Sequence, residues 1–238
     1  MKEKQEWREY IWRLLEERGV ARFPGARGRI PNFTGAERCA DRVEQLDLWQ
    51  RARTLKANPD SPQRALRQRA LEQGKIVYMA VPRLGKLACF IELDPQRLPR
   101  PAQAATIKGA MRYGRPVRLE EMAKIDLVLC GSVVVNRRGE RLGKGSGYSD
   151  LEYALAAEAG KLGDNTPILT TLHPLQIIGD ALPWRPHDIG VDCIVTPAEA
   201  ICTRPLHPRP PGVLWHFLDE NKIAAIPILA QQAMKSKN

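Results

Sequence analysis

The sequence predicts an α/β protein: a single three-layer α/β/α domain over residues 1–238, in which helices cover both faces of a mostly parallel sheet. Apolar segments of strand length alternate with segments of helical periodicity, which is the order typical of such sheets. One segment, residues 125–135, is apolar almost throughout, as expected of a strand buried on both faces. With 238 residues, of which 43% are hydrophobic, the chain can bury one substantial core.

The elements before residue 125 begin with an amphipathic helix. Residues 3–18 place four apolar side chains on one helical face, and Gly19 follows as a stop signal. Ser61-Pro62 opens a later helix, because proline fits the first helical turn, where its missing N–H is not needed. The elements expected between these points and residue 125 are a helix at 36–49, a strand and loop at 55–60, a helix at 61–74, strands at 76–81 and 87–93, and a helical stretch at 101–113.

The elements after residue 125 surround a glycine-rich loop at residues 141–150, which a turn at 136–139 precedes. Ser149 and Glu152 have the spacing of a capping box, which predicts a helix from there to about residue 161. Strand, turn, glycine loop and helix is the layout in which open α/β sheets bind ligands at the carboxyl ends of their strands. The last expected segments are strands at 167–172 and 193–196 and a proline-rich surface loop at 205–211.

The glycine loop is the strongest functional signal in the sequence. Gly143, Gly145 and Gly147 lack a Cβ, so they can take positive φ angles and turn successive backbone N–H groups toward one anion. The helix N-terminus after the loop adds further unpaired N–H donors, and Arg141 and Lys144 add two positive charges. These features predict a polyphosphate site. The alternative is a solvated turn with ordinary surface charges, because the loop matches neither the P-loop nor the dinucleotide fingerprint.

Acidic residues near the loop suggest a divalent cation. Asp150, at the end of the loop, would repel a bare phosphate, whereas a carboxylate beside a phosphate loop commonly holds Mg²⁺. Asp192 precedes a predicted strand and is expected to complete the Mg²⁺ shell. The expected cofactors are therefore ATP and Mg²⁺.

The histidines are weaker candidates. His173 ends a predicted strand before Pro174, and a lone histidine is more often structural than catalytic. His187 and Asp188 are adjacent in the sequence, and their expected role is to shape a loop.

Composition limits the classes of partner and compartment. The net charge of +10 comes from basic residues that are interspersed with acidic ones, and an aromatic content of 6% offers no stacking platform. We therefore expect anionic small-molecule ligands rather than a specific nucleic acid. No segment approaches 18 uninterrupted apolar residues, the N-terminus is charged, and five scattered cysteines form no CxxC pair. These features favour a soluble cytoplasmic protein with no membrane association; they give no indication of oligomeric state.

Several motifs together resemble the 5-formyltetrahydrofolate cyclo-ligases, also called methenyltetrahydrofolate synthetases. Residues 141–150 are similar to the family's Arg-Leu-Gly-x-Gly-x-Gly-Tyr-Tyr-Asp loop, except that Ser149 replaces the second tyrosine. Lys4 and Arg8 resemble two N-terminal cations that contact the nucleotide in the family, and residues 187–192 resemble its His-Asp-x-x-Val-Asp segment. The resemblance implies a fold of the NagB/RpiA/CoA-transferase-like class.

The resemblance is strongest to a branch of that family, the methenyltetrahydrofolate synthase domain-containing proteins. The stretches that carry it are residues 29–33, 58–60, 143–154 and 226–229. Departures from the enzyme pattern fall on the folate side: where the enzymes carry a glutamate that helps hold the pterin, this chain has Ser61-Pro62-Gln63, and Pro62 cannot hydrogen-bond a pterin.

The activity that the resemblance implies is ATP- and Mg²⁺-dependent conversion of 5-formyltetrahydrofolate to 5,10-methenyltetrahydrofolate, with release of ADP and phosphate. Two alternatives stay open: a diverged member that binds ATP but acts on another small metabolite, and a non-catalytic nucleotide-binding module. On the first interpretation, Tyr148 lies at the boundary with the second substrate and joins Arg141 and Lys144 as a catalytic candidate. The residues expected to bind the nucleotide are Lys4, Arg8, Arg141, Gly143, Lys144, Gly145, Ser146, Gly147 and Tyr148.

Overall fold

The computed structural model describes residues 2–235 and has the expected α/β architecture around an eight-stranded sheet. Five neighbouring strands in its middle run parallel, while the strands at its two edges pair antiparallel. In spatial order the strands are β13 (Ala200–Cys202), β12 (Cys193–Val195), β10 (Ile168–Thr171), β7 (Leu127–Cys130), β3 (Thr54–Ala57), β4 (Ile76–Ala80), β5 (Phe90–Leu93) and β6 (Arg115–Val117).

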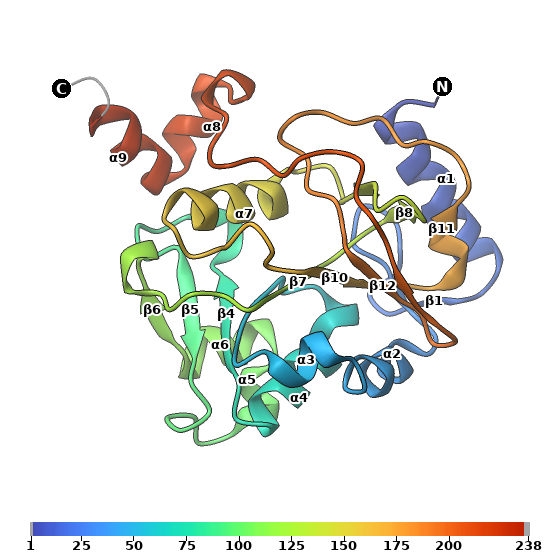
Figure 1. Cartoon of the computed structure of the whole chain (residues 1–238), viewed down its shortest axis with the longest axis horizontal. Helices are drawn as coiled ribbons and strands as arrows, with labels where there is room; N and C mark the ends of the chain where they lie inside the picture. The colour runs from blue at the N-terminus through green and yellow to red at the C-terminus, as the bar shows by residue number, and fades with distance from the viewer. Residues whose placement is uncertain (1, 236–238) are drawn as a thin grey trace.

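Helices flank this sheet on both sides (Figure 1). In that view, the helix that follows the glycine loop lies above the sheet, and the helices of residues 36–72 lie below it. No helix within residues 2–235 is long and apolar enough to cross a bilayer. The α-helices are α1 (Lys4–Glu17), α2 (Ala36–Val43), α3 (Asp47–Arg51), α4 (Arg64–Glu72), α5 (Pro101–Ala104), α6 (Ile107–Tyr113), α7 (Tyr148–Glu158), α8 (Glu220–Ala225) and α9 (Pro227–Lys235).

The apolar run at 125–135 forms two strands rather than the one that was expected. β7 ends at Cys130, and β8 (Val134–Asn136) belongs to a separate sheet with β9 (Arg141–Leu142) and β11 (Ile177–Ile178). The chain leaves the main sheet at Gly131, where an added Cβ would lie 2.7 Å from Asp60 Oδ2, and bends before β8. Both strands are fully buried, so apolar composition alone did not reveal the bend.

Two helix boundaries also differ from the expectation. The expected helix at 36–49 is interrupted between α2 and α3, where residues 44–46 form a turn. The expected capping box at Ser149 is wrong: α7 begins at Tyr148, and its N-cap is Gly147, two residues earlier than expected, at φ +69°. Ser149 and Glu152 instead point into the protein, where both contact other buried or half-buried polar groups.

Helix α1 packs against the small β11-β8-β9 sheet rather than against the main one. Trp7, Ile11, Trp12 and Leu15 of α1 share an apolar cluster with the start of β8 and the end of β9. Because β9 leads directly into the glycine loop, this packing brings the N-terminal end of α1 to that loop.

Candidate active site

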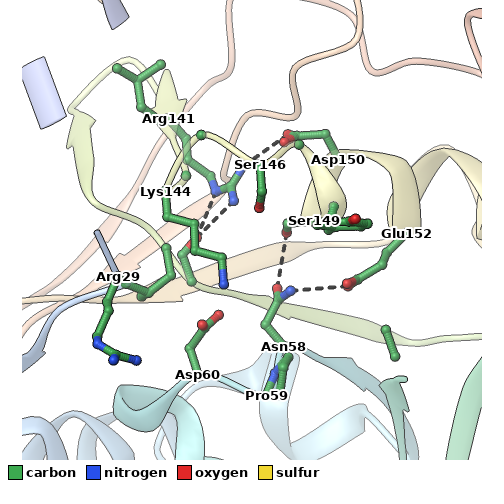
Figure 2. A pocket seen from close by; sticks show the side chains of 18 of the residues that line it. Arg29, Asn58, Pro59, Asp60, Arg141, Lys144, Ser146, Ser149, Asp150 and Glu152 are labelled. Atoms are coloured by element: carbon green, nitrogen blue, oxygen red, sulfur yellow. Dashed lines mark hydrogen bonds and ion pairs between the residues drawn. The ribbon is translucent and has the colours of Figure 1, made fainter. Parts of the chain in front are cut away.

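A cavity of about 850 Å³ opens at the carboxyl ends of β3, β4 and β7. The segments that follow these three strands line it together with the glycine loop and the first turns of α1. Ligand pockets typically measure about 300–1,000 Å³, so this cavity has room for a large ligand or for two adjoining ones. Figure 2 shows its polar half, where side chains from the loop face those from the segment after β3.

The glycine loop has the backbone that an anion site requires. Gly145 and Gly147 have φ angles of +107° and +69°, so both need glycine, whereas the φ of Gly143 is not positive. None of the amide N–H groups of residues 143–147 donates a hydrogen bond to another described residue. The loop then enters the N-terminus of α7. A run of free donors and a helix N-terminus thus adjoin the cavity.

Arg141 is a buried guanidinium that connects three parts of the site. Its Nε and Nη2 donate to the carbonyl of Gly131 at 3.2 and 2.9 Å, and Nη1 donates to Asp150 Oδ1 at 3.1 Å. A Cβ on Gly143 would lie 3.0 Å from Nη2, which explains a glycine there despite its ordinary φ. These bonds use three of the five guanidinium N–H groups and fix Arg141 between the loop and Asp150. Its expected contact with a phosphate stays a prediction.

Lys4 and Arg8 reach the cavity from α1 and contact different segments. Lys4 Nζ donates to Asp188 Oδ1 and Oδ2 at 2.7 and 2.5 Å. Arg8 Nε donates to the carbonyl of Gly143 at 2.7 Å. Burial lowers the pKa of Arg8, against the opposing effect of Asp188 and Asp150. The pair therefore joins α1 to the glycine loop and to the Asp188 loop.

Asp150 and Asp188 are brought together at the cavity wall. Asp150 Oδ1 accepts a hydrogen bond from the amide of Ile189, the residue after Asp188, at 3.2 Å. The sequence assigned Asp188 to loop geometry, and its Oδ2 does accept from the amide of Arg185 at 2.6 Å. However, its carboxylate also lines the cavity, so Asp188 is a functional candidate that the sequence reasoning missed. The signal was its place beside His187 in the motif that resembles the family.

Asp192 does not lie at this site, contrary to the expectation that it joins Asp150. It precedes β12, at the amino end of that strand, whereas the cavity lies at the carboxyl ends of the parallel strands. Its Oδ2 accepts from the amide of Ile168 at 2.7 Å and pairs with Arg209. These bonds give Asp192 a structural role at the opposite edge of the sheet.

The exposed part of the loop faces a carboxyl group that the sequence reasoning also missed. Figure 2 shows the Lys144 side chain extending toward Asp60, with Ser146 farther along the loop. Asp60 comes from Asn58-Pro59-Asp60, directly after β3. Burial raises the pKa of Asp60, and Lys144 is the strongest charge that opposes this shift. Polar residues immediately after a buried strand were the available signal.

A buried ion pair forms the floor of the polar half. Lys56 Nζ lies 2.5 Å from Glu152 Oε2, and their side chains are only 1% and 7% exposed. Asn58 Nδ2 donates to the same Glu152 oxygen at 3.1 Å, and Ser149 Oγ donates to Asn58 Oδ1 at 3.2 Å. Burial raises the pKa of Glu152 in spite of Lys56. This chain of contacts joins β3 to α7 beneath the loop.

The remaining half of the cavity is mainly apolar. Tyr148, the first residue of α7, is half-buried where the glycine loop ends, and Ser61 lines the wall beside Asp60. Pro62 and Gln63 are buried and do not line the cavity, so the carboxyl group available near this helix start is that of Asp60. The apolar lining consists of Met79, Ala80, Val81, Pro82, Ile91, Ile107, Ala110 and Met111.

The two candidate histidines have different surroundings. His173 lies outside the cavity lining, and its Nδ1 accepts from the amide of Leu175 at 3.2 Å, which is a structural role. His187 lines the cavity, where its Nε2 is 3.8 Å from Asp188 Oδ1 and burial lowers its pKa. A largely neutral His187 beside Asp188 adds little charge to the site at neutral pH.

Comparison with known proteins identifies relatives over most of the chain. Residues 1–197 match the model of the 5-formyltetrahydrofolate cyclo-ligase family. The methenyltetrahydrofolate synthase domain-containing protein of Bos taurus is 38% identical over 235 residues, and that of Homo sapiens 35% over 236; each alignment covers 95% of this chain. The chain spans 60% of the length of each of these relatives. The 5-formyltetrahydrofolate cyclo-ligase of Mycolicibacterium smegmatis is 26% identical over 139 residues, which cover 58% of this chain and 68% of that protein.

A solved structure supports the fold. The NMR structure of Aquifex aeolicus 5,10-methenyltetrahydrofolate synthetase superposes with a TM-score of 0.53 at 18% identity, covering 84% of this chain and 93% of that one. At this identity the likeness shows a shared fold. The match to the family model, which extends over residues 1–197, shows more: this chain belongs to the 5-formyltetrahydrofolate cyclo-ligase family.

Proposed function

We propose that this chain converts 5-formyltetrahydrofolate to 5,10-methenyltetrahydrofolate at the expense of ATP, releasing ADP and phosphate. The observation that carries the proposal is one continuous cavity that has free loop amides on one side and an apolar wall on the other. A reaction that joins a polyphosphate to a bicyclic substrate needs two such surfaces next to each other. Family membership supplies the substrate class.

The polar half is suited to the triphosphate. The unpaired amides of residues 143–147 can each donate to a phosphate oxygen, and the N-terminus of α7 adds the positive end of its dipole. Lys144 is exposed on the loop and is hydrogen-bonded to no described residue, so its ammonium is available to a phosphate. Lys4 and Arg8 add two positive charges from α1. ATP binding in this half is the first element of the proposal.

Magnesium fits the acidic pair beside the loop. Among the described residues, no group of three or more His, Cys, Asp or Glu side chains could hold a metal by itself. Mg²⁺ commonly binds one or two carboxylates together with substrate phosphates, so Asp150 and Asp188 form a sufficient protein contribution. When bound, the ion would neutralise charge on the phosphates. Arg141 and Lys4 hold these two carboxylates in place.

The apolar half and Asp60 are suited to the reduced folate. A pterin presents an N3–H and a 2-amino group on one edge, and a carboxylate can accept from both. Asp60 is the carboxyl group near the start of the helix at which cyclo-ligases carry their pterin glutamate, and it faces the cavity. The methionine and isoleucine side chains of β4, β5 and α6, with Pro82 after β4, provide apolar surface for the aromatic part.

The proposed chemistry proceeds by two displacements. The formyl oxygen attacks the γ-phosphorus of ATP, and ADP leaves. The N10 nitrogen then attacks the activated formyl carbon, N10 releases its proton to solvent, and phosphate leaves as the five-membered ring closes. The protein contributes by aligning the two substrates and by neutralising phosphate charge, for which Lys144 and the loop amides are placed. Tyr148 lies where the two ligands would meet.

A direct test mixes the protein with ATP-Mg and 5-formyltetrahydrofolate and follows the methenyl product by its near-ultraviolet absorbance. The control is Asp150→Ala, which keeps the glycine loop but removes one of the carboxylates. We expect a Mg²⁺-dependent signal that the variant loses. If the wild-type protein binds ATP by calorimetry but forms no product, the folate part of the proposal is wrong.

A second candidate keeps the nucleotide site and changes the other substrate. The observation that favours it is that Lys144 extends toward Asp60, so the positive charge of this lysine already compensates the negative charge of the Asp60 carboxylate. A chain that used Asp60 only to hold Lys144 would not need a pterin. Turnover of ATP with another small metabolite, but not with 5-formyltetrahydrofolate, would favour this candidate.

A further inference from the structure

The C-terminal part of the chain returns to the glycine loop. Residues 198–238 lie beyond the family match, which ends at residue 197. After β13 the described chain crosses the surface and forms α8, which lies above α7 in Figure 1. The segment thus reaches the glycine loop from a part of the chain that lies outside the family match.

Lys222 of α8 makes the contact with the loop. Its Nζ donates to the carbonyl of Ser146 at 3.2 Å and lies 5.6 Å from the centre of the Tyr148 ring. A Cβ on Gly147 would come within 3.1 Å of this nitrogen. The side chain of Asp219 caps α8 by accepting from the amide of Lys222 at 2.7 Å, which fixes the start of the helix. One ammonium therefore touches three consecutive residues at the end of the loop.

A second contact lies on the neighbouring loop. Phe217, two residues before the Asp219 cap, packs edge-to-face against His187, with ring centres 4.9 Å apart. His187 directly precedes Asp188 in the cavity wall. The C-terminal segment therefore contacts both loops that carry the acidic pair, the glycine loop before Asp150 and the loop of Asp188.

The geometry of the Ser146–Gly147 peptide links the Lys222 contact to the orientation of a loop N–H group. In a trans peptide the carbonyl and the N–H point to opposite sides, so a cation that holds the Ser146 carbonyl also orients the N–H of Gly147. That N–H is one of the loop amides with no acceptor among the described residues. A hydrogen bond to the carbonyl also polarises the peptide and strengthens its N–H as a donor. Lys222 forms no ion pair with any carboxylate of residues 2–235, so its charge is not neutralised within the part of the chain that is described.

We propose that Lys222 is a positioning residue of the nucleotide site, supplied by the C-terminal segment, which orients the Ser146–Gly147 peptide toward the phosphates of the nucleotide. This inference rests on the proposed function, because it requires a polyphosphate in the loop. It makes affinity depend on the number of phosphates: the contribution of Lys222 is greatest for ATP, smaller for ADP and absent for AMP.

The test measures binding of ATP-Mg, ADP and AMP by calorimetry to the full chain and to three variants. Lys222→Ala should weaken ATP binding about three- to tenfold, as expected for one partly exposed charged hydrogen bond, with a smaller loss for ADP and none for AMP. Lys222→Arg should restore ATP binding, because it keeps a donor and a charge. Lys124→Ala is the charge-matched control: Lys124 is exposed and precedes the amino end of β7, away from the cavity, so it should bind as the wild type does.

Three results would overturn the inference. The first is ATP binding to Lys222→Ala that equals the wild type. The second is an equal loss for AMP and ATP, which would indicate general disruption rather than a phosphate-dependent role; a thermal melt of each variant identifies this case. The third is an arginine variant that fails to restore binding while it melts like the wild type. A wild-type protein that binds none of the three nucleotides would instead refute the proposed function on which the inference rests.

Discussion

Breaking the Lys56–Glu152 ion pair should strongly destabilise the protein. At 2.5 Å the attraction between the two charges is about 7 kcal/mol for an effective dielectric of 20, and most of it is offset by the cost of removing both ions from water. Removing one partner leaves that cost without the attraction. For Glu152→Gln, which keeps the side-chain volume, we expect a loss of about 3–5 kcal/mol in the free energy of unfolding.

The loss should be measured by urea denaturation at pH 7 with tryptophan fluorescence. In a chain of this length it corresponds to a fall in melting temperature of about 6–20 °C. Lys56→Met should be destabilising by a similar amount, and the double variant should lose less than the sum of the two, because no unpaired charge stays buried. The matched control is Arg13–Glu17, an ion pair of 3.7 Å whose side chains are 68% and 64% exposed. Breaking it should change stability by about 0.5 kcal/mol or less.

The stability of the double variant shows whether Lys56 and Glu152 stabilise each other or contribute independently. If the two single losses add in the double variant, the ion pair carries no coupling energy, and the interpretation that each ion stabilises the other is wrong. If Glu152→Gln is as stable as the wild type, Glu152 is already protonated in the folded protein. Burial raises the pKa of Glu152, which favours its protonated form, so this comparison tests a real alternative to the ion pair.

Three further predictions concern the cavity. At pH values above neutral, Asp60→Asn should raise the melting temperature. Burial raises the pKa of Asp60, so its ionised form is disfavoured in the folded protein. The gain should shrink as the pH falls and the wild-type carboxyl is protonated. Scans at several pH values check this, and a gain independent of pH would contradict it. Gly145→Ala should cost about 1–3 kcal/mol in urea unfolding and abolish ATP binding, because φ is +107° there; unchanged binding would show that the loop does not hold the phosphates. The variants Asp150→Asn and Asp188→Asn should each raise the Mg²⁺ concentration needed for ATP binding about tenfold or more. Asp192→Asn should leave that concentration unchanged. An effect at Asp192 alone would restore the sequence-based assignment of Asp192 to the Mg²⁺ shell.

The sequence predicted the fold class and a glycine loop that leads into a helix, because both depend on local patterns. Buried parallel strands are apolar throughout, as in β3, β7 and β10, and amphipathic helices repeat at their own period. Glycine permits the positive φ angles that Gly145 and Gly147 adopt, although Gly143 does not adopt one. These features required no knowledge of distant contacts.

The assignment of the second acidic residue failed because it depends on strand direction. Asp188 and Asp192 are four residues apart in the sequence, and both precede β12. Which of them reaches the cavity depends on how residues 184–192 cross from the α1 side to the amino end of β12. Lys4 and the amide of Ile189 decide this through contacts that are distant in sequence from their partners. No local pattern in the sequence records these contacts.

The bend after β7 explains why the fold and the candidate site depend on the same residue. Gly131 leaves the main sheet at a point where a Cβ would lie 2.7 Å from Asp60 Oδ2 and 2.9 Å from two Ile30 atoms. Its carbonyl, freed from the strand ladder, accepts two hydrogen bonds from Arg141, which in turn holds Asp150. A single straight strand through residues 125–135 would have placed that carbonyl in the sheet and left the buried guanidinium without its acceptor. The break between β7 and β8, which the apolar sequence pattern did not reveal, is therefore the feature that connects the segment after β3 to the glycine loop.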